Sequence, residues 1–362
     1  LAVGVVTANY FYGDGSNLTG AGGFSADADL NLMASNTCSG CSLDGSNGCF
    51  NVLLGACAGK TIAGGDTNVF IGCNAGKDVV EAHSNVFLGG NAGRCFTGAT
   101  ADCNIAIGKD TLWGCNGDTY ATGTGKHNIA MGSLAGRAVS SGEYNIAFGH
   151  LAGCMIGAAS HNVYMGYSAG QMMCCKGNIG IGCCALHGSG TASNNNGCFN
   201  IGIGELAAGY SLTSGKYNIA FGVSSGRCVS SGDHNITIGA DAGRNLTTGE
   251  ENILIGRAAA DSATITGCRN TALGYGAGKN LTGAFKNVFI GDNAGCDVST
   301  GGRNTFIGSY AGKCQTTGSY NVMFGCSAGQ RMIVDGSNQF AIGCKDCSWI
   351  TGNANWNVGI GT

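Results

Sequence analysis

The chain has 362 residues, of which 68 are glycine and none is proline; 44% are hydrophobic, 11% are charged, and the formal net charge is -3. The absence of proline and of a regular glycine triplet excludes collagen, and the high apolar content with little charge argues against disorder. So few positive charges cannot neutralise a run of phosphates, so we expect no nucleic-acid partner, and no apolar run is long enough for membrane insertion.

Residues 1–48 precede the regular part of the sequence and are interpreted as an N-terminal connector or capping segment. The segment GDGSN at 13–17 has oxygen-bearing side chains but not a full Ca²⁺ ligand set, so a plain turn is the preferred interpretation. Because the chain begins at Leu1, we expect it to be a piece of a longer polypeptide.

From residue 49 to residue 343 the sequence repeats a unit of about 17 residues, approximately N-[VI]-x-[IFLM]-G-x-x-A-G-[KR] followed by a second glycine turn. A unit this short cannot hold a helical hairpin, but it can hold short strands joined by tight turns. We therefore predict an all-β fold, a parallel β-solenoid in which each copy forms one rung. The copies open at Asn51, Asn68, Asn85, Asn104, Asn128, Asn145, Asn162, Asn178, Asn200, Asn218, Asn235, Asn252, Asn270, Asn287, Asn304, Asn321, Asn338 and Asn357.

The opening segment of each rung is predicted to be a strand. Its second and fourth positions are apolar, the alternation of a strand that buries one face. The middle position is also apolar in nearly every copy, with Thr237 as the polar exception. A single-chain solenoid covers only its inner face, whereas strands apolar on both faces are usually covered on both. We therefore predict that the outer face packs against other chains.

The opening asparagines tolerate turn geometry, and their side-chain amides can bond to one another from rung to rung. Stacked rungs are spaced by about 4.8 Å, so the predicted rod is roughly 80–90 Å long. Such a stack has open ends that other segments or subunits must cover.

A row of cations follows the small Ala-Gly or Ser-Gly pair at the tenth position of many rungs. Neighbouring like charges repel, so partners are expected, and the carboxylates just before the asparagines (Asp66, Glu143, Asp233, Glu250 and Glu251) are candidates. Solubility and inter-chain pairing are the preferred roles, and a track for anionic polysaccharide is the alternative. The row comprises Lys60, Lys77, Arg94, Arg137, Arg227, Arg244, Lys279 and Lys313.

Two insertions break the period, at 109–127 and 183–199. Insertions in solenoids form surface loops, often on the binding face. Trp113 and Tyr120 in the first loop and His187 and Asn195 in the second are therefore candidate binding residues. The alternative for Trp113 is that it lies tucked under a simple bulge.

The 21 cysteines are spread over several positions of the rungs, and an odd number leaves at least one free or paired between chains. We expect most to be reduced and buried, with some disulfides as the alternative. Cys38 with Cys41, and Cys344 with Cys347, have the spacing of half a zinc site, but each pair alone is weak evidence. We predict no metal or other cofactor.

Residues 344–362 are interpreted as a last rung that leads into a further module. The acidic residues of the chain are scattered singly, and His127, His161 and His234 lie in the turn position before the repeat asparagine. A polysaccharide hydrolase needs two carboxylates across a cleft. We therefore predict no catalytic residues and no enzyme activity.

Three segments carry a resemblance to known families. The N-[VI]-x-[IFL]-G-x-x-A rungs resemble the head repeats of trimeric autotransporter adhesins. GVVTANYFYGDGSNLTG at 4–20 is similar to a segment of structural proteins of tailed phages, especially those of marine cyanobacteria, and NVGIGT at 357–362 resembles the start of a phage-fibre segment that leads into a trimerisation or chaperone module.

The resemblance implies a homotrimeric fibre of a virion, which contacts other virion proteins and positions or contacts a host surface polysaccharide or receptor. It assigns no binding residue. The alternatives are a trimeric adhesin on a bacterial surface and a polysaccharide-degrading tailspike.

Overall fold

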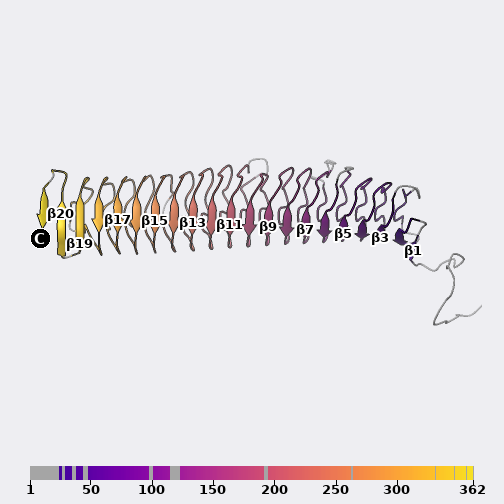
Figure 1. The fold of residues 1–362 in the computed structure, drawn as a ribbon, viewed down its shortest axis with the longest axis horizontal. Coiled ribbons are helices and arrows are strands. Elements are labelled where there is room, and N and C mark those ends of the chain that lie inside the picture. The colour runs from indigo at the N-terminus through magenta and orange to yellow at the C-terminus, as the bar shows by residue number, and fades with distance from the viewer. Residues whose placement is uncertain are drawn as a thin grey trace, which may run out of the picture.

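The computed structural model describes residues 24–26, 29–34, 38–43, 48–97, 101–114, 123–190, 195–261, 264–330, 332–345, 347–355 and 357–361. These residues contain strands and turns but no helix, and the strands stack in chain order along a rod (Figure 1). The strands are β1 (Phe24–Ala26), β2 (Leu32–Ala34), β3 (Val52–Leu54), β4 (Val69–Ile71), β5 (Val86–Leu88), β6 (Ile105–Ile107), β7 (Ile129–Met131), β8 (Ile146–Phe148), β9 (Val163–Met165), β10 (Ile179–Ile181), β11 (Ile201–Ile203), β12 (Ile219–Phe221), β13 (Ile236–Ile238), β14 (Ile253–Ile255), β15 (Thr271–Leu273), β16 (Val288–Ile290), β17 (Thr305–Ile307), β18 (Val322–Phe324), β19 (Phe340–Cys344), β20 (Cys347–Gly352) and β21 (Val358–Ile360).

Strands β2 to β19 pair in parallel, each with the next strand along the chain. The register is set by the repeat, so that Phe70 of β4 lies beside Phe87 of β5. Rungs are also bonded away from the strands, for example from the amide of Gly76 to the carbonyl of Ala92 at 2.9 Å. The all-β parallel solenoid predicted from the sequence is confirmed.

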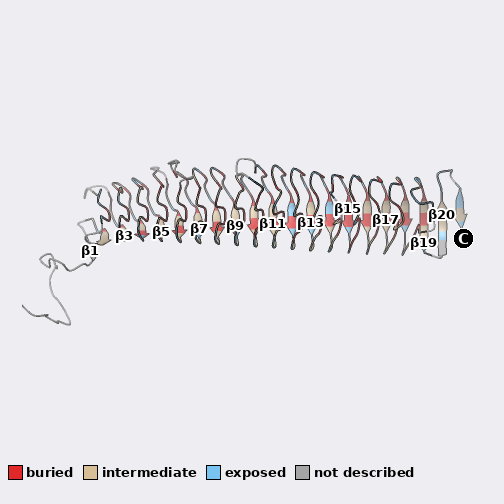
Figure 2. Cartoon of the chain, turned by 180° about the vertical axis from the view of Figure 1, so that it is seen from behind, coloured by how far each residue is buried: buried red, intermediate tan, exposed pale blue. Residues whose placement is uncertain are grey.

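The middle residue of each strand from β3 to β18 is buried, as the red colour of the strands in Figure 2 shows. Phe70 and Phe87 are fully buried and stack with ring centres 4.9 Å apart, and Ala75 and Val79 of the same turn complete the core around them. The first and third residues of these strands, which are the second and fourth repeat positions, lie on the opposite, outer face; the sequence predicts two apolar faces but not which of them is the inner one. Alternation places these positions on one face but does not say which face is inside.

The repeat asparagines form a buried ladder. Asn145 donates from Nδ2 to Asn128 Oδ1 at 3.0 Å and to the carbonyl of Ala159 at 2.9 Å. Its own Oδ1 accepts the amide and the Nδ2 group of Asn162 at 3.1 and 3.0 Å. All four interactions recur at most rungs, so a polar group is buried without an unpaired atom. The predicted ladder is confirmed for residues that include Asn68, Asn145, Asn218, Asn235, Asn287, Asn304 and Asn321.

The glycine that ends each strand is required by close stacking. Gly72 has a φ of +135°, which side chains rarely adopt, and an added Cβ would lie 2.6 Å from the carbonyl oxygen of Gly89 on the next rung. Equivalent glycines lie against each other along the rod, so the corner stays narrow at every rung.

Polar substitutions inside the rod are compensated locally. Thr237 is buried in place of an apolar middle residue, and Ser225 replaces the alanine of the preceding rung. Ser225 donates from Oγ to the backbone oxygen of Thr237 at 2.8 Å and lies 2.9 Å from its Oγ1. The two substitutions therefore satisfy each other in the core.

The asparagine ladder begins earlier in the chain than the sequence predicts, and its last residue is a glutamine. Asn31 precedes β2 and accepts the amide of Asn51 at 2.8 Å, so the stack begins within the segment 1–48. At the last parallel rung the ladder residue is Gln339, whose amide donates to Asn321 Oδ1 at 2.8 Å. Asn338 is exposed and occupies the corner before it, so its assignment as a ladder residue was wrong. The longer glutamine amide replaces asparagine there.

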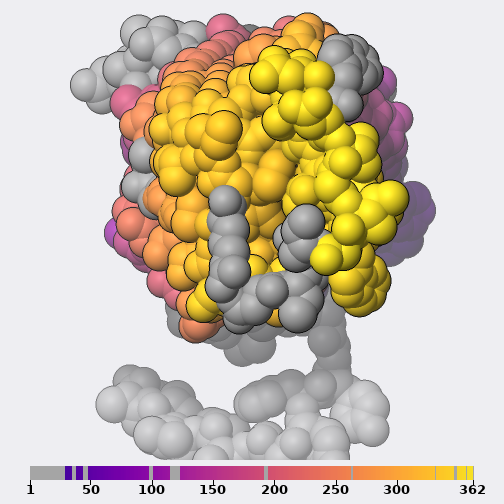
Figure 3. All heavy atoms as spheres, turned by 90° about the vertical axis from the view of Figure 1, so that its left-hand side faces the viewer, coloured from indigo at the N-terminus to yellow at the C-terminus, as the bar shows by residue number. Residues whose placement is uncertain are grey.

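The C-terminal segment 344–362 was expected to be a further rung, but β20 pairs antiparallel with β19, and β21 pairs antiparallel with β20. Asn357 is exposed and does not open a parallel rung. Figure 3 shows the yellow C-terminal residues on one side of this end of the rod. At the other end β1 pairs antiparallel with β2. The segment 4–20 lies outside the described residues.

Candidate functional site

The outer face of the sheet carries two continuous rows of apolar side chains, the outer rows, formed by the first and third residues of β3 to β19. The rows are in register from rung to rung, and only Thr271 and Thr305 interrupt their apolar character. Several members are strongly exposed, such as Met131 at 41% and Phe221 at 53%. From strand spacing the strip is about 80 Å long and 10 Å wide, or about 800 Å².

A strip of this size is unusual for an isolated chain. The largest apolar patch on a typical monomer is about 300–600 Å². About 800 Å² is what each partner contributes to a standard protein–protein interface. The outer rows are therefore the most extensive candidate for an interaction surface along the described rungs.

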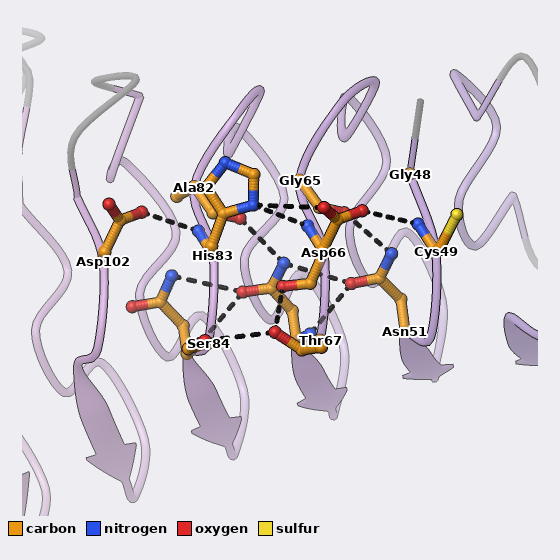
Figure 4. Close-up of polar contacts among 12 residues, drawn as sticks. Gly48, Cys49, Asn51, Gly65, Asp66, Thr67, Ala82, His83, Ser84 and Asp102 are labelled. Carbon is orange, nitrogen blue, oxygen red and sulfur yellow. Dashed lines mark hydrogen bonds and ion pairs between the residues drawn. The ribbon is translucent and has the colours of Figure 1, made fainter. Parts of the chain in front are cut away.

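A second repeated structure lies at the corner just before the ladder asparagines (Figure 4). The Asp66 carboxylate accepts the amide of Cys49 at 2.7 Å, and the Asp102 carboxylate accepts the amide of His83 at 2.7 Å. Between them, His83 Nδ1 accepts the amide of Asp66 at 3.0 Å. Each side chain thus binds a backbone amide of the preceding rung, and this Asp–His–Asp series stabilises the corner.

Aromatic side chains stack along the next position of the same corner. The ring of Tyr144 lies between those of His127 and His161, with centres 4.9 and 5.2 Å apart. Tyr217 lies in the same way between Phe199 and His234. The three histidines occupy turn residues with φ near +60°, as their position in the repeat predicted. Each of these histidines stacks on a tyrosine ring on one face.

The predicted cationic row exists as a row of tenth-position residues, but its contacts differ from the prediction. Arg244 contacts Asp241 at 3.7 Å and Asp261 at 3.6 Å, and Arg94 contacts Asp78 at 3.7 Å. Other members lie over aromatic rings. Arg227 is 5.8 Å from the ring centre of Tyr210, and Lys313 is 4.9 Å from that of Tyr310.

Within the chain, two of the carboxylates proposed as partners of this row instead contact cations of their own corner, and Asp66 and Asp233 accept the backbone amides of Cys49 and Lys216. Glu143 lies 3.8 Å from Lys126, and Glu251 lies 2.7 Å from Arg269. The row and these carboxylates occupy different positions of the repeat, the tenth position and the positions just before the asparagine. The row contains Lys60, Lys77, Arg94, Arg137, Arg227, Arg244, Lys279 and Lys313, with Asp261 between Arg244 and Lys279 in the same position. Burial raises the pKa of Asp261, and Arg244 acts in the opposite direction.

Trp113 occupies the tenth position of its rung and is half-buried between two arginines. The guanidinium carbons of Arg94 and Arg137 lie 6.0 and 5.1 Å from the indole centre. Both faces of the indole are therefore covered. This agrees better with the alternative in which Trp113 lies tucked under a bulge than with an exposed binding residue. Tyr120 lies outside the described residues.

The second insertion is anchored to the rod. Asn195 is buried, donates to the carbonyl of Met172 at 3.1 Å and accepts the amide of Ser189 at 3.0 Å. It therefore holds the loop and has no surface from which to contact a ligand. His187 is half-buried, its Nε2 atom lies 3.1 Å from Gln171 Oε1, and its ring makes a tilted contact with Tyr210 with ring centres 5.0 Å apart.

A disulfide joins Cys175 to Cys198 across this insertion, and Cys95 is also disulfide-bonded. Of the free cysteines that the structure describes, only Cys154, Cys184 and Cys296 are buried. The expectation of mainly buried thiols was therefore wrong, because most cysteines occupy corner positions rather than the core. Burial and the neighbouring Asp297 raise the pKa of Cys296 to about 11, which keeps this thiol protonated.

The structure brings no further described ligand to the weak metal candidates. Cys38 and Cys41 are exposed, and a hydrogen bond with Cys38 raises the pKa of the Cys41 thiol. Cys344 lies opposite Cys347 at the turn between β19 and β20. In the described part of the chain, no three histidine, cysteine or acidic side chains are grouped as metal ligands.

The sequence prediction missed the arginine–aromatic pairs and the side-chain ladder of Asp66, His83 and Asp102. A signal for both was present, because members of each set recur near one repeat position in successive rungs. None of the described residues forms a helix suited to crossing a bilayer. No protein-family model matches the chain, and no curated protein is significantly similar to it.

Proposed function

We propose that the chain is the rigid shaft of a homotrimeric virion fibre, which positions or mediates attachment to a host surface and has no enzyme activity. In this assembly the outer rows of three chains face one another along the fibre axis. The apolar outer rows are the observation that carries the proposal. Their estimated area is close to that of one side of a stable interface.

The shape of the chain supports a spacer role. The parallel rungs are bonded to each other at the strands and at the corners, which favours a stiff rod over a hinged one. Each rung contacts only its neighbours, so length can be added without changing the cross-section. The number of chains and the virion location rest on the resemblance of the rungs and of segments 4–20 and 357–362.

The proposal is tested by the mass of the purified chain in light scattering, together with two matched double variants. Met131→Lys with Phe221→Lys puts charges into the outer rows on well-separated rungs. Val80→Lys with Val223→Lys changes apolar residues of similar exposure, 37% and 51%, outside the strands. We expect three chains for the wild type and the second variant, and a monomer for the first.

A monomeric wild type would contradict the assembly, and a dimer would contradict the threefold arrangement. Equal dissociation by both variants would show that the outer rows are not the interface. Circular dichroism checks that each variant keeps the β fold. Antibodies against the chain should label fibres on the virion, and labelling of a bacterial surface without virions would favour the adhesin alternative.

A further inference from the structure

Three consecutive rungs place Arg94, Trp113 and Arg137 in one stack at the tenth-position corner. Their rungs are adjacent, because the amide of Cys95 donates to the carbonyl of Trp113 at 2.9 Å and that of Gly114 donates to Arg137 at 3.0 Å. The two guanidinium carbons lie 6.0 and 5.1 Å from the indole centre. The indole thus lies between two positive charges, which would repel each other if the two arginines stood on adjacent rungs.

The stack contains three hydrogen-bond donors without acceptors. Arg94 Nε, Trp113 Nε1 and Arg137 Nε are buried atoms with no hydrogen-bond partner among the described residues. Asp78 lies 3.7 Å from Arg94 Nε, which is an ion-pair contact but too long for a hydrogen bond. Buried donors in proteins are nearly always paired, so three on adjacent rungs call for an explanation.

The charge around the stack is positive, as the binding of an anion requires. Lys60 and Lys77 continue the same row on the two rungs before Arg94, and Asp78 is the acidic residue that directly contacts the stack. This part of the row is positive although the whole chain carries a formal net charge of -3. A negatively charged ligand would therefore be drawn to this corner specifically.

We propose that Arg94, Trp113 and Arg137 form a binding site for an acidic polysaccharide, whose carboxylates accept hydrogen bonds from the two guanidiniums and the indole. The arginines are half-buried, and rotation of their side chains turns the covered Nε–H groups toward the ligand. Charge-assisted hydrogen bonds of this kind are the strong ones. Because the guanidiniums cover the indole faces, recognition rests on these bonds and not on stacking of a sugar ring.

The spacing of the arginines favours a polysaccharide over a nucleic acid. Arg94 and Arg137 are two rungs apart, which is about 10 Å along the rod. In a uronic-acid polymer such as polygalacturonate every sugar has a carboxylate, and carboxylates two sugars apart lie at a comparable interval, whereas each nucleic-acid strand has a phosphate about every 3.4 Å of helix axis. The site belongs to one chain, so it does not depend on the proposed trimer.

The test measures binding of polygalacturonate to the full chain, with neutral dextran and a single-stranded oligonucleotide as comparisons. Arg94→Gln with Arg137→Gln should weaken polygalacturonate binding about tenfold or more. Arg257→Gln with Arg303→Gln is the matched control, because it removes the same charge from two arginines that also lie over tyrosine rings, at 4.9 and 5.0 Å. The control should bind within about twofold of the wild type.

Two further variants separate the contributions. Trp113→Phe keeps an aromatic ring but removes the indole N–H, and it should weaken binding a few-fold. Arg94→Lys with Arg137→Lys keeps the charge and loses the planar donor groups, so an intermediate loss is expected and any folding defect of the glutamine variant is bypassed. Circular dichroism follows the fold of each variant.

Several results would overturn the proposal. Absence of wild-type binding to polygalacturonate at low salt is the first, and an equal loss in both glutamine variants, which would indicate attraction to overall charge, is the second. Tighter binding of the oligonucleotide than of polygalacturonate would replace the polysaccharide by a nucleic acid. The oligomeric mass of the chain is measured in parallel, so failure of this site and failure of the fibre proposal are distinguished.

Discussion

The asparagine ladder and the outer rows both run along the parallel rungs. They differ in burial, because a single chain buries the ladder but leaves the outer rows partly exposed. The ladder asparagines are buried, and at most rungs both N–H groups of the side-chain amide are hydrogen-bonded, as for Asn145. The outer rows are apolar over a similar length and remain half-buried or exposed. One repeat therefore encodes two things, a ladder that specifies the fold of a single chain and a surface that favours contact with another.

The largest effect is expected from breaking the ladder. Asn235→Leu removes the acceptor of the Asn252 amide and Nδ2 group, at 3.0 and 3.1 Å, and the donor to the carbonyl of Gly249 at 2.8 Å. Several buried groups would lose partners, so we expect the free energy of unfolding to fall by about 3–5 kcal/mol. Urea unfolding measures the loss, and hydrogen exchange should show it centred on β12 to β14.

The control for this prediction is Asn245→Leu. Asn245 is half-buried at a corner and donates to the carbonyl of Asp261 at 2.7 Å, outside the ladder. Its replacement should cost about 1 kcal/mol. Equal losses at Asn245 and Asn235 would mean that the ladder has no special role.

A smaller effect is expected inside the rod at the Ser225–Thr237 pair. Ser225→Ala and Thr237→Val should each lower the free energy of unfolding by about 1 kcal/mol, since each leaves the remaining hydroxyl with fewer partners. The double variant replaces both hydroxyls by apolar groups and should cost no more than either single change. Additive losses in this double-mutant cycle would contradict the pairing.

These contrasts also explain which features the sequence predicted. The ladder was predictable because an asparagine recurs at one spacing, but Gln339 was missed because Asn338 stands beside it and fits the pattern. The partners of the cationic row were not predictable, because the turns decide which positions share a corner. The pairing of β20 and β21 was missed because NVGIGT matches the repeat, but its strand β21 pairs with β20, which runs opposite to the rung strands.

A still smaller effect on the single chain is expected in the outer rows. Ile253→Thr places a threonine at the first position of β14, where β15 and β17 already have Thr271 and Thr305. Ile253 is exposed. The free energy of unfolding of the dissociated chain should change by about 0.5 kcal/mol or less. A loss of several kcal/mol in dilute solution would mean that the outer rows stabilise the fold itself.

The smallest effect concerns the exposed pair of Glu251 and Arg269, whose Nε and Oε2 atoms are 2.7 Å apart. The hydrogen bond and the charge of Arg269 lower the pKa of Glu251. The contribution of the pair to the free energy of unfolding is therefore present above the ordinary glutamate pKa of about 4.3 and is lost as the pH falls through the lower pKa of the folded chain.

Glu251→Gln should remove this pH dependence of stability with little change at neutral pH, because solvent and salt screen exposed charges. Thermal unfolding of wild type and variant between about pH 6 and pH 3, at low and high salt, measures the difference. A large difference that persists at high salt would mean that this corner contributes to the fold as the ladder does, since its charges would then not be screened.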